Sequence, residues 1–114
     1  MSLSLTPAQA LTLWHAVSLA MVRGEEPDLS LRQISILLTI YLEAPPHTVR
    51  DLARKLGVSK PVINRALDSM GKLEFVTRRR DEADRRNVLI QRTLKGALYL
   101  ERFADTVVSL SRSV

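Results

Sequence analysis

Apolar residues recur along the first half of this chain at helical spacing, and polar start signals divide them into separate segments. Thr6-Pro7-Ala8-Gln9 and Ser30-Leu31-Arg32-Gln33 each have the pattern of a capping box at the start of a helix. The first helix is expected to run to about Arg23 and to end at Gly24, and Pro45-Pro46 stops the second. Two helices joined by a short polar loop are therefore predicted.

These two predicted helices differ in how much of their circumference is apolar. The polar residues of the first helix form only a narrow stripe: Thr12, His15, Ser18 and Arg23. A helix that is apolar nearly all round is buried on more than one side. In a chain of 114 residues, one of those sides is expected to meet another subunit. The second helix has a single apolar face, formed by Ile34, Leu37, Leu38, Tyr41 and Leu42.

Residues 49–68, VRDLARKLGVSKPVINRALD, have the pattern of a helix-turn-helix. Thr48 caps a short predicted helix that ends at Gly57, and Ser59 caps a second one that runs to about Lys72. Ala53 is small where the two helices cross, and Gly57 can adopt the left-handed conformation. The core between them is expected to contain Leu52, Leu56, Val58, Ile63 and Leu67. An ordinary helical hairpin is the alternative.

The exposed start of the second of these helices carries residues suited to reading DNA. Asn pairs bidentately with adenine and Arg with guanine in the major groove, whereas Ser and Lys can contact either phosphate or base. The ring of a proline could press on a thymine methyl group. The predicted DNA contacts are Ser59, Lys60, Pro61, Asn64 and Arg65. Any one of them alone would more often be a solvated helix position.

Beyond residue 72 the apolar spacing changes from helical to alternating. Phe75–Arg78 and Val88–Gln91 are predicted to be short strands, so the segment between them is the loop of a hairpin. Thr93 caps a final long helix, and residues 111–114 are expected to fray. The predicted fold is mainly α with a small β-hairpin: a winged helix-turn-helix whose wing is the hairpin loop. The apolar arc of the last helix contains Leu94, Ala97, Leu98, Phe103, Ala104, Val107 and Val108.

The wing, RRRDEADRRN, is rich in charges of both signs. A wing reaches along the DNA backbone or into the minor groove, where the negative potential favours arginine. Asp84 is expected to hold the loop by pairing with a neighbouring arginine or with backbone amides, while Arg86 or Arg85 is presented to the groove. The alternative is a salt-bridged, solvated loop, but exposed ion pairs contribute only about 0–1 kcal/mol each. The remaining arginines are expected near phosphates: Arg78, Arg79 and Arg80.

Charge and composition narrow the choice of partner. The formal net charge is +5, and residues 48–93 carry 12 Lys or Arg against 6 Asp or Glu, whereas the rest of the chain carries 5 against 6. A polyanion that meets the central segment is the natural partner, and ordinary solubilising charge is the alternative. There is no cysteine, which excludes disulfides and thiolate metal sites. Without a membrane span or a secretory signal pattern, a cytoplasmic protein is expected.

From about Leu31 to Leu98, the chain resembles the MarR family of bacterial winged-helix transcription regulators. The most specific part runs from Asp84-Arg85-Arg86 through Val88–Gln91 to Thr93-Leu94-Lys95-Gly96. These residues are similar to the wing tip, the following strand and the helix start of that family. LARKLGVSKPVINRALDSM is similar to its recognition unit.

The resemblance implies a homodimer that binds double-stranded DNA. Helices at about 1–24 and 94–114 would intertwine as the dimerisation region, and residues 30–93 would form the DNA-binding winged helix. The recognition helices would enter successive major grooves of a pseudo-palindromic operator. Arg86 would be the wing-tip arginine in the minor groove, and Asp84 would orient the wing.

The chain departs from the family pattern in three respects, and it leaves open whether an effector is bound. Glu74 stands where members usually have glycine, Arg92 stands where they usually have leucine, and the C-terminal region has room for little more than one helix. Many members bind a small molecule between their dimerisation and DNA-binding regions. No residue identifies such an effector here. Trp14, His15 and Tyr41 would either line a pocket or, more commonly, belong to the core.

Three functions remain compatible with these patterns. The leading hypothesis is a dimeric, sequence-specific transcriptional regulator, a repressor that occludes its operator. An architectural or replication-associated DNA-binding protein of low sequence specificity is the first alternative, and a weak specificity ratio would mark it. A winged helix used for protein–protein contact is the second, although such modules usually lose the basic tip and wing. An enzyme, a cofactor site and a metal site are not expected, because His15 and His47 have no catalytic or metal-binding neighbours at suitable spacing.

Overall fold

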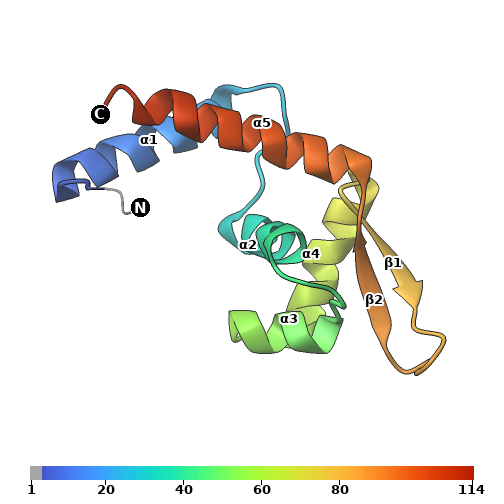
Figure 1. The fold of residues 1–114 in the computed structure, drawn as a ribbon. Helices are drawn as coiled ribbons and strands as arrows, with labels where there is room; N and C mark the ends of the chain where they lie inside the picture. Colours follow the sequence, from blue (N-terminus) through green and yellow to red (C-terminus); the bar gives the residue numbers. More distant parts are fainter. Residues whose placement is uncertain (1–3) are drawn as a thin grey trace. The chain divides into compact units, whose positions relative to one another are not determined.

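The computed structural model describes residues 4–114, and within that range the chain forms helices and one two-stranded antiparallel sheet (Figure 1). The predicted order of four helices, a hairpin and a helix is confirmed. The elements are α1 (Pro7–Arg23), α2 (Leu31–Leu42), α3 (Val49–Leu56), α4 (Lys60–Lys72), β1 (Val76–Arg80), β2 (Val88–Arg92) and α5 (Leu94–Ser111).

The chain divides into two compact units. The described residues 4–28 and 100–114 form one unit, called here the terminal unit, and residues 29–99 form the winged-helix unit. The boundary in α5 falls after Tyr99 because the first turns of this helix pack within the winged-helix unit, where the Tyr99 ring lies 4.7 Å from the ring of Phe75. In the terminal unit, an ion pair between Glu26 and Arg102 connects the loop after α1 to α5.

The predicted helix starts are present as hydrogen bonds. Thr6 and Ser30 each form a complete capping box with the glutamine three residues later. The hydroxyl of Thr48 accepts a hydrogen bond from the amide of Asp51 at 3.1 Å, and the hydroxyl of Thr93 accepts one from the Gly96 amide at 2.9 Å. These side chains satisfy amides that have no partner inside the helix, which is why the elements begin at these residues.

The apolar face predicted for α2 is partly wrong. Ile34 and Leu37 are buried, but Leu42 is 79% exposed, and the fully buried Ile36 and Ile40 were not among the predicted residues. The reason is that α2 is the central helix of its unit and packs against α3, α4 and β2. Contacts on several sides widen the buried arc beyond one stripe, whereas Leu42 at the helix end lies outside these contacts.

The helix-turn-helix forms as predicted. Gly57 ends α3 in the left-handed conformation, with φ of 68°, and Ala53 is buried where α3 and α4 pack together. Leu52, Ile63 and Leu67 are buried in the shared core, as predicted. Leu56 and Val58 are only half-buried. The alternative of an ordinary helical hairpin is excluded by the hairpin of strands that follows and packs on α4.

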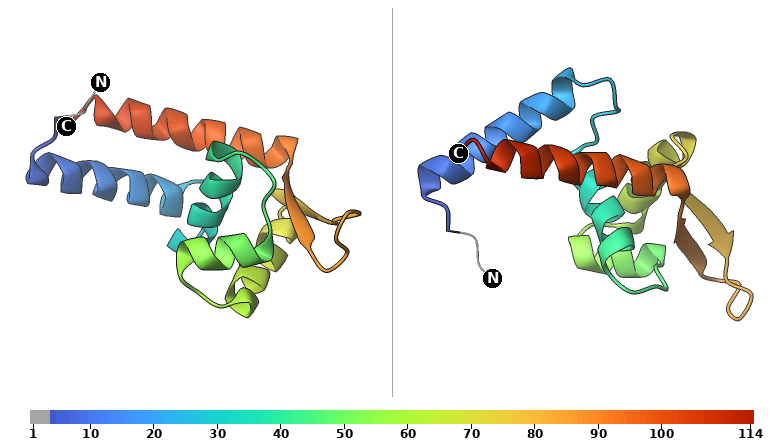
Figure 2. Two further views of the ribbon diagram at one scale, coloured as in Figure 1. Left: turned by 60° about the horizontal axis from the view of Figure 1, so that its bottom comes forward. Right: turned by 45° about the horizontal axis from the view of Figure 1, so that its top comes forward.

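The strands differ from the predicted bounds: β1 is longer toward the wing, and β2 begins at Val88 as predicted but runs one residue further, to Arg92. β1 begins one residue later than predicted and extends to Arg80, which pairs with Val88. Polar side chains at these positions gave no apolar alternation, but the backbone ladder continues regardless of side-chain type. On its other side β2 meets the segment before α3, where the Ile90 amide donates to the His47 carbonyl at 2.9 Å. The strands contact α3 and α4, and both views in Figure 2 show the loop between β1 and β2 projecting beyond these helices.

Arg92, one of the two residues that depart from the family pattern, has a structural role. Its Nε donates to the Ile40 carbonyl at 3.0 Å, its Nη2 donates to the Glu43 carbonyl at 3.3 Å, and its guanidinium lies 5.6 Å from the centre of the Tyr41 ring. The Tyr41 hydroxyl in turn donates to the Thr93 carbonyl at 2.7 Å. Arg92 therefore satisfies carbonyls at the C-terminal end of α2, a position that favours a cation.

Glu74, the other departure, keeps the turn that a glycine would make. Its φ is 63°, in the left-handed region. The Glu74 amide donates to the Gly71 carbonyl at 2.9 Å and the Phe75 amide donates to the Met70 carbonyl at 2.9 Å. These two bonds form a Schellman motif, which requires a left-handed residue after the helix end and usually has glycine there.

We expect Glu74→Gly to raise the free energy of unfolding by up to about 1 kcal/mol. The left-handed conformation costs a non-glycine residue about 1–2 kcal/mol, and the greater flexibility of unfolded glycine offsets about 0.5–1 kcal/mol of that gain. Urea denaturation of both proteins measures the difference. Glu101→Gly in the exposed middle of α5 is the matched control and should lower stability by about 1 kcal/mol. A loss of stability in Glu74→Gly would contradict the strained turn.

Candidate nucleic-acid interface

The predicted recognition residues all lie at the start of α4 and are exposed there. Ser59, Lys60, Pro61, Asn64 and Arg65 face solvent. The opposite face of α4 carries its buried residues, so this helix is anchored by one side and presents the other. The buried residues are Ile63, Ala66, Leu67 and Met70.

The capping role predicted for the Ser59 side chain is wrong. Ser59 occupies the N-cap position with extended backbone angles, but its side chain makes no capping hydrogen bond. The sequence pattern correctly located the helix start, although it assigned the hydroxyl a role that the structure does not give it. The Ser59 hydroxyl is therefore available at the positive end of the helix dipole.

A cleft of about 400 Å³ brings the start of α4 together with the wing. Lys60 and Asn64 line it from α4, and Asp84 and Arg86 line it from the wing. Segments from separate elements thus meet at one surface, as the winged-helix prediction requires. Five further residues of the cleft were not predicted as site residues: Thr48, Val49, Arg50, Asn87 and Val88.

Arg50 is the most informative of these missed residues. It is exposed in the first turn of α3, lines the cleft and acts electrostatically on Asp84. Its position two residues after Thr48 gives no indication of a neighbour in the wing. Arg50 comes to lie beside the wing only when the hairpin folds. A cation here adds to the positive charge of Lys60 and Arg86 around the same cleft.

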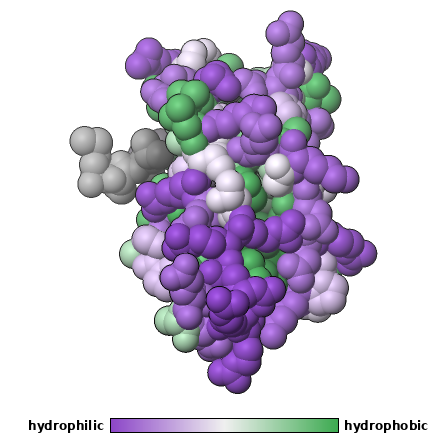
Figure 3. Space-filling view, turned by 90° about the vertical axis from the view of Figure 1, so that its right-hand side faces the viewer, coloured by the Kyte–Doolittle hydropathy of each residue, from purple (hydrophilic) through white to green (hydrophobic). Residues whose placement is uncertain are grey.

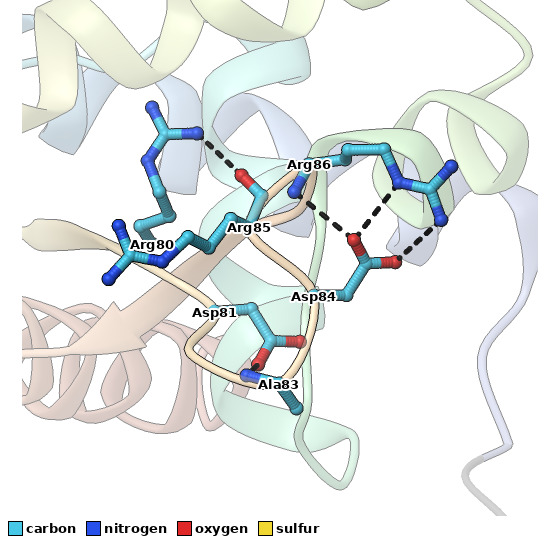
Figure 4. Close-up of polar contacts among 6 residues, drawn as sticks. All are labelled: Arg80, Asp81, Ala83, Asp84, Arg85 and Arg86. Carbon is cyan, nitrogen blue, oxygen red and sulfur yellow. Dashed lines mark hydrogen bonds and ion pairs between the residues drawn. The ribbon is translucent and has the colours of Figure 1, made fainter.

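Asp84 organises the wing (Figure 4). Its Oδ1 accepts hydrogen bonds from the Arg86 amide at 3.2 Å and from Arg86 Nε at 3.1 Å, and its Oδ2 accepts one from Arg86 Nη2 at 3.3 Å. The carboxylate thereby holds one edge of a guanidinium group whose side chain is 90% exposed. The Asp84 backbone carbonyl also accepts the Asn87 amide at 2.9 Å. This geometry fits the expected orienting role, with Arg86 itself as the oriented residue.

The other wing arginines divide into two groups. Arg78 forms an ion pair with Asp68 on α4, and Arg80 donates to the Arg85 carbonyl. The guanidinium groups of Arg79 and Arg85 have no hydrogen-bond or ion-pair partner among the described residues. The five arginines, predicted as a set of DNA contacts, therefore differ in how much of their charge is available to a partner.

Figure 3 views the molecule from the side on which Figure 1 draws the hairpin. Its lower part, where the wing points toward the viewer, is covered mainly by hydrophilic residues, with little hydrophobic surface between them. In the described part of the chain, no group of three or more His, Cys, Asp and Glu side chains could hold a metal ion. None of the described helices has the length and apolar character needed to cross a membrane.

The pKa of the Asp84 carboxyl lies below its ordinary value because Arg86 donates to it from its side chain and from its amide, and because Arg50 is near. We expect Arg86→Ala to move this pKa upward, as followed by the carboxyl carbon resonance in an NMR titration. Because folding lowers the pKa of Asp84, this contact contributes to the stability of the folded protein at pH values above the unfolded pKa. It is lost as the pH falls through the folded pKa. Arg79→Ala removes a wing charge without a bond to Asp84 and should shift the pKa less; equal shifts would contradict the assignment.

The arrangement of three helices and a hairpin, with the second helix of a helix-turn-helix exposed beside the wing, defines the winged helix-turn-helix class of proteins. A model of the MarR family matches residues 29–88. The chain belongs to the MarR family.

Solved structures of this class superpose well on the chain. A mutant of S. aureus MepR bound to an oligodeoxyribonucleotide has a TM-score of 0.81 at 17% identity, with 96% of this chain and 82% of that chain covered. CouR from Rhodococcus jostii RHA1, bound to p-coumaroyl-CoA, has a TM-score of 0.67 at 26% identity and coverages of 89% and 68%. BldR from Sulfolobus solfataricus has a TM-score of 0.67 at 26% identity and coverages of 92% and 71%. No curated protein matched the chain.

Proposed function

We propose that this protein is a homodimeric, sequence-specific DNA-binding transcriptional regulator that represses by occluding its operator. The observation that carries the proposal is the meeting of Lys60 and Asn64 of α4 with Arg86 of the wing around one basic cleft. Recognition helices supply base contacts and wings supply minor-groove and phosphate contacts, so both must face the same duplex. Membership of the MarR family and the likeness to MepR in its complex with DNA support this function.

The dimer is supported by the apolar surface of α1. Among the described residues of the terminal unit, only Val17 is a buried hydrophobic residue. Leu11, Trp14 and Val22 are exposed and lie along one stripe of the helix at i, i+3 and i+11. An exposed apolar stripe on a unit with a single buried hydrophobic residue is typical of a protein interface. Trp14 and His15, expected in a core or a pocket, are both exposed in the single chain.

Fluorescence anisotropy with two labelled duplexes, across a salt series, tests the proposal. One duplex comes from the region upstream of the gene for this protein, and the other is its scrambled sequence. We expect much tighter binding to the upstream duplex, with affinity that falls steeply as salt rises because phosphate contacts release counterions. Arg86→Ala should lose about 1–3 kcal/mol on the upstream duplex, the typical cost of one specific contact.

Arg112→Ala, which removes the same charge near the end of α5, is the control and should bind nearly as the natural protein does. Equal binding to both duplexes would replace the regulator with a DNA-binding protein of low specificity. Failure to bind either duplex at low salt would reject DNA as the partner. Repression is tested by in vitro transcription from the upstream promoter, where added protein should lower the yield of transcript.

A further inference from the structure

Arg78 and Asp68 connect the wing to the recognition helix. An ion pair joins Arg78 Nη2 on β1 to Asp68 Oδ1 on α4. Asp68 lies four residues after Asn64 and three after Arg65, so it belongs to the same side of α4 as these two predicted DNA contacts. Arg78 sits in the middle of β1, opposite the buried Ile90. This ion pair is a direct side-chain bond between the two parts of the proposed DNA surface.

The strand geometry places Arg78 on the face of β1 that is turned toward α4, where its side chain is partly covered. Alternate residues of a strand face the same side, so Arg78 shares its face with Val76, which is buried. Its side chain is 34% exposed, compared with 90% for Arg86. Arg79, on the opposite face of β1, is exposed and has no bonding partner among the described residues. Arg79 is therefore better placed to contact a phosphate than Arg78.

The pair is too exposed to contribute much to folding. Asp68 is 59% exposed, and ion pairs of this kind are weak contributors to stability because water screens them. Its stronger effect is geometric, because binding sites depend on supporting bonds that hold the contacting groups in place. A hairpin that is free to swing could not keep Arg86 in register with Asn64 on the same duplex.

We propose that Arg78 and Asp68 are positioning residues, which set the wing against the recognition helix and thereby set sequence specificity, and that Arg78 does not contact phosphate. This inference rests on the proposed DNA-binding function. It replaces the sequence-based expectation for Arg78, which placed all three arginines of β1 near phosphates.

Asp68→Asn distinguishes this positioning role from a purely electrostatic effect, because the two explanations predict opposite changes in affinity for the upstream duplex. If charge alone mattered, removal of a carboxylate beside the DNA would strengthen binding to every duplex. If the pair positions the wing, Asp68→Asn should bind the upstream duplex about tenfold more weakly, the cost of roughly one specific contact, while the scrambled duplex binds as well or better. The specificity ratio therefore falls although the protein has become more positive.

Glu82→Gln is the matched control. Glu82 is exposed in the wing loop and has no bonding partner among the described residues, so its neutralisation changes charge by the same amount without breaking a bond. We expect it to bind both duplexes at least as tightly as the natural protein. Thermal melts should show all variants folded, with midpoints close to that of the natural protein.

A double-mutant cycle completes the test. Arg78→Gln should reduce specificity as Asp68→Asn does, and the double variant should be no worse than either single variant, because both remove the same bond. Tighter binding of Asp68→Asn to the upstream duplex, or additive losses in the double variant, would overturn the positioning role. Absence of binding by the natural protein would instead reject the proposed function, so the two failures are distinguishable.

Discussion

Gly96→Ala should lower the free energy of unfolding by about 3 kcal/mol, near the upper end of the typical cost of overpacking. Gly96 is buried in the first turn of α5, where a Cβ atom would lie 2.5 Å from the Tyr41 hydroxyl oxygen and closer still to the Phe75 carbonyl oxygen. The Phe75 carbonyl belongs to the backbone, and the Tyr41 hydroxyl is bonded to both the amide and the carbonyl of Thr93. Neither neighbour can move without disrupting the packing of α2 and α5 against the segment that precedes β1.

The sign of this effect is informative because helix propensity favours the opposite result. Alanine is better than glycine inside a helix by about 1 kcal/mol, so Gly96→Ala would be neutral or stabilising if the site had room. Urea denaturation measures the difference, and a thermal midpoint lowered by on the order of 10 °C should accompany it.

Gly71→Ala provides the matched control in the last turn of α4. A Cβ atom there would meet nothing within 4 Å, and its backbone does not have a positive φ. We expect this substitution to stabilise the protein by up to about 1 kcal/mol. Destabilisation of both variants to a similar extent would contradict the packing explanation. We infer that the Thr93-Leu94-Lys95-Gly96 motif ends in glycine because Phe75 and Tyr41 leave no room for a Cβ atom.

Trp14→Glu should convert the proposed dimer into a monomer and weaken binding to the upstream duplex by about 10²–10⁴-fold, the gain that two linked binding sites provide. In the single chain Leu11 is 73% exposed and Trp14 is 59% exposed, on one stripe of α1. Burial of one such side chain contributes about 1.5–3 kcal/mol, and a carboxylate in its place would have to be desolvated without a partner.

Sedimentation velocity gives the mass of each variant, and the anisotropy assay gives its affinity. Thr12→Glu introduces the same charge on the polar stripe of α1 and should leave both quantities nearly unchanged. A natural protein that sediments as a monomer at micromolar concentration would reject the dimer. A monomeric Trp14→Glu that still binds the upstream duplex with full affinity would show that one winged-helix unit is sufficient.

Predictions that depended on neighbouring residues were the most accurate. Capping boxes at Thr6 and Ser30, the left-handed Gly57 and the order of elements all rest on contacts within about one helical turn, so the local sequence specifies them. Apart from the missing capping hydrogen bond of Ser59, the errors arose where distant elements decide the outcome. The buried arc of α2 depends on three partners that no periodicity in α2 reveals, and the extension of β1 to Arg80 depends on its pairing with β2.

The wing shows the same division at the level of single side chains. The sequence correctly indicated a loop in which Asp84 pairs with a neighbouring arginine, because Asp84 and Arg86 are two residues apart. It did not distinguish Arg78 from Arg79, whose difference comes from the face of β1 that packs on α4. Nor did it identify Arg50, because α3 approaches the wing only after the hairpin folds back beside it.

The amino-acid sequence by itself determined the succession of helices and strands, the helix-turn-helix, the basic character of its central segment and the likeness to the MarR family. Each of these is encoded in residue types at short spacing. Only the tertiary structure decided which charges are bonded and which are open, why Gly96 must be glycine, and how Glu74 and Arg92 fit where the family has other residues. These properties depend on distances between residues far apart in the chain, and such distances exist only once the core has packed.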